Sequence, residues 1–316
     1  MLLVPHDARH LPWLRNEIMA AAVRCLAPVG DKCGEAALWS ASENAVYWTD
    51  INRFLIHRFQ TESKTVRSWI FDEPVVALSL TRAPDWLLVA LASRLIYWRP
   101  ESDERRPHGF ILPGSPEVRL NDGRSDPVGN FWVGSMKNNM APDGSLTEAG
   151  KGAGILYRIT PQGEVSEWRT GLGISNTLCW SPDATRFYFG DTMENAIYAY
   201  DYDRTKASIS GEHAFFAGYD RGAPDGSAID SEGSVWNCRF GGACVVRVSP
   251  TGEVQRIVEM PVTNVTTCCF GGPGLKTLYI TTASILAPPS DRLAGSLFSI
   301  EAGVAGLPEN QFAAAP

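Results

Sequence analysis

Short apolar segments rich in aromatic residues recur along the chain at a steady spacing and are separated by polar turns. Most are followed by a second apolar segment, and a polar turn then leads to a third. Their lengths are typical of β-strands, because a helix needs a longer segment with a 3.6-residue period. The pattern therefore predicts an all-β protein. The clearest segments cover residues 45–48, 86–90, 131–134, 186–190, 234–237 and 277–280.

The spacing between equivalent points is roughly 40 to 55 residues, which is the length of a four-stranded propeller blade. Six such units fit between Arg24 and Ile300. We therefore predict a six-bladed β-propeller over residues 21–303, and we expect the lone strand at 21–26 to complete the last blade. Two β-sandwiches are the alternative, but they do not explain six equal units.

Three segments lie outside the regular pattern. Residues 1–20 are expected to form a short N-terminal extension, and residues 304–316 a frayed C-terminal tail. The longest interruption, 137–154, is rich in glycine, asparagine and other polar residues. We expect it to be a loop over one face of the propeller, where long loops are often functional.

In five of the repeats a polar residue occupies the same position. It lies four residues before the last residue that precedes a turn, and an aromatic strand follows that turn. In a propeller the innermost strands line the central channel, so residues at one register should converge there. The sixth equivalent position falls near the apolar Val76. The five polar residues are Glu35, Asn121, Asn176, Asp225 and Thr266.

The ordinary interpretation of such residues is a local turn, since Asp and Asn often bond to nearby backbone. We assign that role to Asp122, Asp126, Asp183 and Asp230. Glu35 is different, because Glu is a poor turn former and an apolar run follows it. A buried carboxylate without a partner is costly, so Glu35 should meet a cation or Arg119.

Composition narrows the classes of function. The net charge of −7 makes nucleic acid an unsuitable partner. No apolar run is long enough to span a membrane. The N-terminus lacks a hydrophobic signal core, and the seven cysteines lack the spacing of a disulfide framework. We expect a cytoplasmic protein with free thiols; the oligomeric state cannot be predicted.

Several ordered motifs resemble one family, the SMP-30/gluconolactonase/luciferin-regenerating-enzyme family. The similarity extends over about residues 24–300. Each motif is weak alone, and their order makes the resemblance specific. They are Cys33-Gly34-Glu35 with Trp39, Arg119-Leu120-Asn121-Asp122-Gly123, Ser175-Asn176 with Trp180, Pro224-Asp225-Gly226, and Phe270-Gly271-Gly272.

The resemblance implies a six-bladed propeller that binds one divalent cation and hydrolyses lactones. The implied metal ligands are Glu35, Asn176 and Asp225, and Arg119 and Asn121 would contact the substrate. Where some sugar-lactone members carry Glu after the Gly-Ser-Met segment, this chain has Asn139. That departure leaves the sugar specificity open and makes Asn139 a third candidate substrate contact.

The candidate ligands are all oxygen donors, which suits a hard cation such as Ca²⁺, Mg²⁺ or Mn²⁺. Ca²⁺ is favoured, and Zn²⁺ or Fe²⁺ is less suited to this set. The expected function is hydrolysis of a sugar lactone to the aldonic acid, with Lewis-acid activation of the carbonyl and Asp225 as the catalytic base. An alternative for Arg119 is an ion pair with Glu35 or Asp122.

Other kinds of function remain open. One is a calcium-dependent esterase or phosphotriesterase, for which a hydrophobic mouth would be expected; the polar composition of 137–154 argues against it. Another is a propeller that only binds a protein. Nucleophilic serine schemes lack a G-x-S-x-G motif. We expect His57 and His213 to be surface residues.

Overall fold

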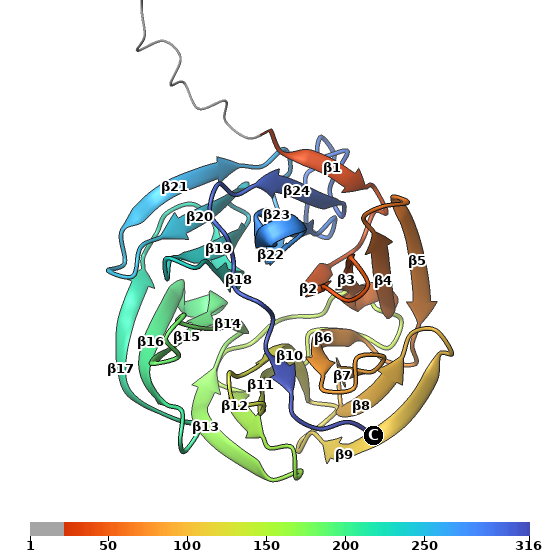
Figure 1. Cartoon of the computed structure of the whole chain (residues 1–316), viewed down its shortest axis with the longest axis vertical. Coiled ribbons are helices and arrows are strands. Elements are labelled where there is room, and N and C mark those ends of the chain that lie inside the picture. The colour runs from red at the N-terminus through yellow and green to blue at the C-terminus, as the bar shows by residue number, and fades with distance from the viewer. Residues whose placement is uncertain (1–21) are drawn as a thin grey trace, which may run out of the picture.

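Antiparallel strands form six sheets arranged radially around a common axis in the computed structural model, which describes residues 22–316 (Figure 1). Five sheets have four strands, and a short extra strand extends the sixth. The predicted six-bladed β-propeller is confirmed. The expected extension 1–20 lies outside the described residues. Within them, no helix is long and apolar enough to cross a bilayer.

Each blade, numbered I to VI from β2 onward, runs outward from the axis. The innermost strands are β2 (Gly34–Ser40), β6 (Val75–Thr81), β10 (Val118–Ser125), β14 (Ser175–Trp180), β18 (Ala223–Ile229) and β22 (Val265–Gly271). The second strands are β3 (Ala45–Asp50), β7 (Leu87–Leu91), β11 (Phe131–Lys137), β15 (Arg186–Asp191), β19 (Val235–Phe240) and β23 (Thr277–Thr282).

The outer half of each blade is more exposed than the inner half. The third strands are β4 (Leu55–Gln60), β8 (Arg94–Arg99), β12 (Gly154–Ile159), β16 (Ala196–Asp203), β20 (Cys244–Val248) and β24 (Leu297–Glu301). The outermost are β5 (Thr65–Ile70), β9 (Glu104–Ile111), β13 (Val165–Leu172), β17 (Ser208–Ala217), β21 (Val254–Glu259) and β1 (Arg24–Ala27). The described part of the chain also contains three short 3-10 helices, η2 (Ile51–Arg53), η3 (Thr192–Glu194) and η4 (Pro273–Leu275).

The hydrophobic core is divided into six clusters, one between each pair of neighbouring blades. Successive side chains of a strand point to opposite faces, so one strand supplies two clusters. Tyr47 packs toward blade II and Trp48 toward blade VI. Because both faces are covered, second strands such as β3 and β7 are buried throughout. This explains why they were the clearest signals in the sequence.

The expected closure of the ring by the N-terminal strand is confirmed. β1 pairs antiparallel with β24, with Arg24 opposite Ser299 and Cys25 opposite Phe298. Blade VI thus combines three strands from the end of the chain with one from its beginning.

Two of the predicted turn aspartates, Asp126 and Asp230, make the same set of hydrogen bonds in two different blades. Asp126 accepts hydrogen bonds from the amide of Asn130 at 2.8 Å and from Trp132 Nε1 at 2.9 Å. Asp230 bonds in the same way to the amide of Ser234 at 3.0 Å and to Trp236 Nε1 at 2.9 Å. Asp183 also closes a local turn.

One histidine prediction is wrong. His57 is buried, with Nδ1 at 2.7 Å from Ser68 Oγ and Nε2 at 3.0 Å from Asp31 Oδ1. Its polar neighbours come from β5 and from the segment before β2, so adjacent sequence did not reveal them. His213 is exposed, as predicted. All seven cysteines are free, and five of them are buried.

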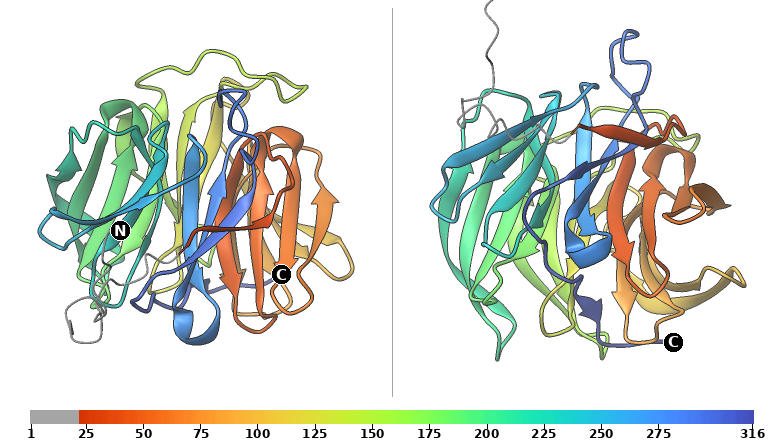
Figure 2. Two further views of the ribbon diagram at one scale, coloured as in Figure 1. Left: turned by 90° about the horizontal axis from the view of Figure 1, so that it is seen from above. Right: turned by 45° about the horizontal axis from the view of Figure 1, so that its top comes forward.

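The expectation of a frayed C-terminal tail is also wrong. The tail crosses the propeller on the face opposite the long loop 137–154 (Figures 1 and 2). Its strand β25 (Gln311–Phe312) pairs parallel with β6, and the Ala313 amide donates to Gly129 O at 2.9 Å. Phe312 is fully buried beside Tyr97 and His108. A two-residue strand is too short to show periodicity, which is why the sequence did not predict it.

We expect Phe312→Ala to lower the free energy of unfolding by about 3 kcal/mol, the usual scale for deleting a buried Phe side chain. Gln311→Ala, on the exposed face of the same strand, should change it by less than about 0.5 kcal/mol. Urea unfolding of both variants checks this. Equal stabilities would mean that the tail does not pack on blade II in solution.

Candidate functional site

Every innermost strand contains a β-bulge at the polar register predicted from the sequence. The register against the second strand shifts between Glu35 and Leu38, Val75 and Ala77, Leu120 and Gly123, Asn176 and Leu178, Pro224 and Ser227, and Val265 and Cys268. A bulge leaves residues out of the hydrogen-bonded ladder and redirects their side chains. Ala36 and Thr177 have positive φ angles of 54° and 52° at these bulges.

The bulges allow close contact between neighbouring innermost strands. A Cβ atom added to Gly226, which follows Asp225, would lie 2.0 Å from Thr267 Oγ1 of blade VI. Only glycine fits there. The glycine of the Pro224-Asp225-Gly226 motif therefore lets the bulge of β18 pack against β22.

Two carboxyl groups meet at this register. Glu35 on β2 and Asp225 on β18 are 8% and 6% exposed, and the two carboxyl groups are close enough to affect each other's pKa. Among residues 22–316, no Lys, Arg or His forms an ion pair with either carboxyl group. Burial, the facing Asp225 and nearby Asp122 raise the pKa of Glu35 well above its usual value. Burial and Asp122 likewise raise the pKa of Asp225.

Asp122 is not the turn residue that we predicted. It lies within β10, beside the bulge and near Glu35 and Asp225. Burial raises its pKa, whereas Arg124 opposes that shift. The bulge in β10 contains two consecutive residues, Asn121 and Asp122. Asp122 is therefore directed toward the propeller axis, although Asp is a residue type that usually forms turns.

Arg119 reaches the same site but pairs with neutral groups. Its Nε and Nη2 donate to Asn139 Oδ1 at 3.1 and 2.9 Å, and its Nη1 donates to Asn121 Oδ1 at 2.7 Å. No carboxylate among the described residues lies within ion-pair distance, so the alternative of an ion pair with Glu35 or Asp122 is not observed. Burial lowers the pKa of Arg119 to about 10.

Asn139 therefore holds Arg119 in place without cancelling its charge. A Glu at this position would form an ion pair with the guanidinium. The amide oxygen accepts two hydrogen bonds but carries no net charge. The departure from the family pattern thus leaves a positive group in the cavity.

The orientation of the Asn176 amide follows from a chain of hydrogen bonds. The Thr192 hydroxyl donates to Pro224 O at 2.7 Å, so its oxygen must accept from Asn176 Nδ2 at 2.8 Å. Asn176 Oδ1 then faces Asn121 Nδ2, 3.3 Å away, on the side of the axis. Thr192 lies in η3 and was not predicted, because it is outside the repeated register.

These side chains line one cavity of about 430 Å³, which contains all the site residues predicted from the sequence. The long loop between β11 and β12 arches over this face, and the loop between β23 and β24 rises beside it (Figure 2). The loop 137–154 is polar in composition, but it contributes Met140 and Leu146 to the cavity. The prediction that this loop would not form a hydrophobic mouth is therefore wrong. Ile285 and Leu286 come from the second loop.

The chemistry of the cavity suits a hard cation. Within residues 22–316 no group of three His, Cys, Asp or Glu side chains is arranged to hold a metal ion. A cation in this cavity would therefore be held by two carboxylates, those of Glu35 and Asp225, together with the amide oxygen of Asn176. A buried carboxyl pair without a positive contact is unfavourable, and a divalent cation between the two would remove the repulsion. Thr266 does not take part, since its hydroxyl donates to Gly34 O.

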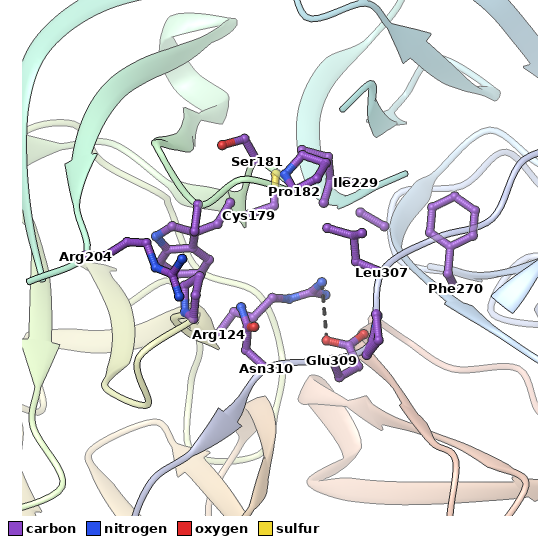
Figure 3. Close-up of a pocket in the computed structure, with 15 residues that line it drawn as sticks. Arg124, Cys179, Ser181, Pro182, Arg204, Ile229, Phe270, Leu307, Glu309 and Asn310 are labelled. Carbon is purple, nitrogen blue, oxygen red and sulfur yellow. Dashed lines mark ion pairs between the residues drawn. The ribbon is translucent and has the colours of Figure 1, made fainter. Parts of the chain in front are cut away.

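A second cavity, of about 340 Å³, lies on the opposite face beneath the tail (Figure 3). Arg124 from β10 points toward Glu309 from the tail, with nitrogen and oxygen atoms 3.7 Å apart (Figure 3). Unlike the carboxyl pair, these two groups neutralise each other. We therefore interpret this cavity as part of the contact between tail and propeller.

Comparisons with known proteins agree with the fold and the motifs. Human regucalcin is 29% identical over 303 residues, which cover 92% of this chain and 98% of that protein. The pentonolactonase XacC of Haloferax volcanii is 31% identical over 287 residues, covering 88% of this chain and 94% of that protein.

Solved structures give the same result. The crystal structure of regucalcin from Agrobacterium tumefaciens, described as a calcium-binding protein, has a TM-score of 0.85 at 26% identity and covers 92% of this chain and 97% of its own. A luciferin-regenerating enzyme has a TM-score of 0.84 at 26% identity, covering 93% and 99%. A family profile described as the SMP-30/Gluconolactonase/LRE-like region matches residues 33–284. The chain therefore belongs to the SMP-30/gluconolactonase/LRE-like family.

Proposed function

We propose that this enzyme, a lactonase by its family, hydrolyses a sugar lactone to the aldonic acid with the help of one divalent cation. The observation that supports this most is the buried Glu35–Asp225 pair, which has no positive contact among residues 22–316. Glu35, Asn176 and Asp225 would hold the cation. Bound there, the cation would supply Lewis acidity toward the lactone carbonyl.

The remaining roles belong to the side chains of the cavity. Asp225 accepts the proton of the attacking water, because it is the carboxylate at the position that the family motif implies is catalytic. Arg119 and Asn121 bind the lactone, and Arg119 donates to its oxygens. Asn139 orients the guanidinium through its amide oxygen, so that the positive charge remains available to the substrate.

A second candidate function has an observation in its favour. Apolar side chains, among them Met140, Leu146, Phe240 and Leu286, line the walls of the cavity. A hydrophobic mouth also suits hydrolysis of aryl esters or organophosphates by the same cation site. A surface that only binds a protein would leave the buried carboxyl pair unexplained.

The first test is acid release from pentono- and hexonolactones with added Ca²⁺, Mg²⁺, Mn²⁺, Zn²⁺ or Fe²⁺, alongside paraoxon and phenyl acetate. We expect lactone turnover with Ca²⁺ and its loss on chelation. Asp225→Ala should abolish both cation binding and turnover, because it removes a ligand and the base. Asp183→Asn, in an exposed turn, is the control and should retain activity. Absence of turnover with every metal would exclude lactone hydrolysis.

Thr192→Val should weaken cation binding about tenfold, the lower end of the range for residues that orient a ligand. The change removes the acceptor that fixes the Asn176 amide but keeps the shape of the side chain. Thr192→Ser keeps the hydroxyl and should bind as the wild type does. Calorimetric titration with Ca²⁺ measures both. Unchanged affinity in the valine variant would show that Thr192 does not orient Asn176.

The metal-free protein should lose stability as the pH rises. The folded-state pKa values of Glu35 and Asp225 are raised above their unfolded-state values. Below about pH 4 both groups are protonated in both states, and their full contribution to stability is present. As the pH rises toward the raised folded-state pKa values, the unfolded state releases protons first and that contribution is lost. The double variant Glu35→Gln/Asp225→Asn lacks both groups. In chelator, the Tm of the wild type relative to this variant should fall between pH 5 and 8, by roughly 2 °C or more. A constant difference would contradict the raised values.

A further inference from the structure

The cavity has a polar floor and apolar walls. Glu35, Arg119, Asn121, Asn176 and Asp225 come from the innermost strands and are nearly buried. The walls and mouth come from the connecting segments. Their apolar members are Ile51, Met140, Leu146, Ile174, Ile285 and Leu286.

Leu286 is the clearest sign that the mouth is built to contact an apolar group. Its side chain is 75% exposed, and its φ angle is 59°, in the left-handed region that a branched side chain rarely adopts. Both features are unfavourable in the free protein, and strained residues of this kind concentrate at ligand sites. A bound apolar group would bury the side chain and compensate for part of that cost.

The two loops that form the mouth are held by specific hydrogen bonds. Asn264 Nδ2 donates to Ile285 O at 2.7 Å, and the Ile285 amide donates to Lys32 O at 3.0 Å. On the other side, Asn52 Nδ2 donates to Gly144 O at 2.7 Å, which holds the loop carrying Leu146. The apolar mouth is therefore a fixed part of the site.

We propose that the preferred substrate is a sugar lactone whose exocyclic substituent is an alkyl group, as in the lactone of a terminally deoxygenated sugar, with the ring carbonyl on the polar floor and the alkyl group between Leu146 and Leu286. This rests on the proposed function. A hydroxylated substituent would lose its hydrogen bonds to water against these walls, where few groups could replace them. The polar side chains that the connecting segments contribute are Asn52, Asn139, Thr147 and Thr192. Three of them are already engaged: Asn52 Nδ2 donates to Gly144 O, Asn139 Oδ1 accepts from Arg119, and the Thr192 hydroxyl bonds to Pro224 O and Asn176 Nδ2.

The test is a series of γ-lactones that differ only in the substituent next to the ring oxygen: hydroxymethyl, methyl, propyl and pentyl. We expect kcat/KM, measured by acid release, to be higher for methyl than for hydroxymethyl. It should then rise roughly fourfold for each CH₂ group that is buried. A preference for hydroxymethyl, or equal values along the series, would overturn the proposal.

Leu286→Ser should lower the ratio of kcat/KM for propyl over hydroxymethyl about tenfold. Leu293→Ser is the matched control: Leu293 lies in the same loop and is 40% exposed, but it does not line the cavity. The ratio should remain unchanged in that variant. Equal ratios in the wild type and Leu286→Ser would overturn the assignment of the mouth.

A binding measurement separates this proposal from the proposed function. Calorimetry with γ-lactams carrying the same substituents needs no hydrolysis. Affinity that rises with chain length and is weakened by Leu286→Ser would support the alkyl site, even if no lactone were hydrolysed. Affinity that is undetectable or equal along the lactam series would overturn it.

Discussion

The pairing of β1 with β24 closes the ring of blades and so fixes the positions of all six. Glu35 lies in blade I and Asp225 in blade V, so blade VI stands between them, and β1 supplies its outermost strand. Without that strand, neither the position of blade VI nor the distance between the two carboxyl groups would be fixed. A short strand near the start of the chain thus determines the geometry of a site formed by residues far apart in the sequence.

The closed ring makes an unfavourable arrangement of charges possible. Two buried carboxyl groups face each other, while the nearby Arg119 is bonded only to neutral acceptors. A flexible site would relax by separating the carboxyl groups or by pairing one of them with the guanidinium. Here both strands are held by bulges and interblade contacts, so the charges remain available to a cation and a substrate.

Hydrogen bonds to the backbone keep Asp225 in position. The Thr177 hydroxyl and Asn237 Nδ2 both donate to the Asp225 carbonyl, the latter at 3.2 Å, and Arg239 donates to Asn237 Oδ1 at 3.2 Å. This network holds the main chain of Asp225 through its carbonyl and not through its carboxylate. The Asn176 side chain is held differently, by donating from Nδ2 to the Thr192 hydroxyl oxygen. Thr177 comes from the blade next to that of Asp225, and Glu35, Asn176 and Asp225 come from three different blades, so no single repeat contains the complete site.

The six repeats, their aromatic strands and the polar register can be read from the amino-acid sequence, because strand periodicity and turn chemistry are local properties. The sequence therefore identified Glu35, Asn176 and Asp225 as residues at one level of the propeller. Only the tertiary structure decided that Asp122 faces the interior, that His57 is buried, that Phe312 anchors the tail, and that a polar loop presents Met140 and Leu146 to the cavity. Bulges, the parallel pairing of the tail and the closure of the loops decide which side chains come together in these places. Such contacts join segments that are distant in the sequence, so they produce no periodic pattern along the chain.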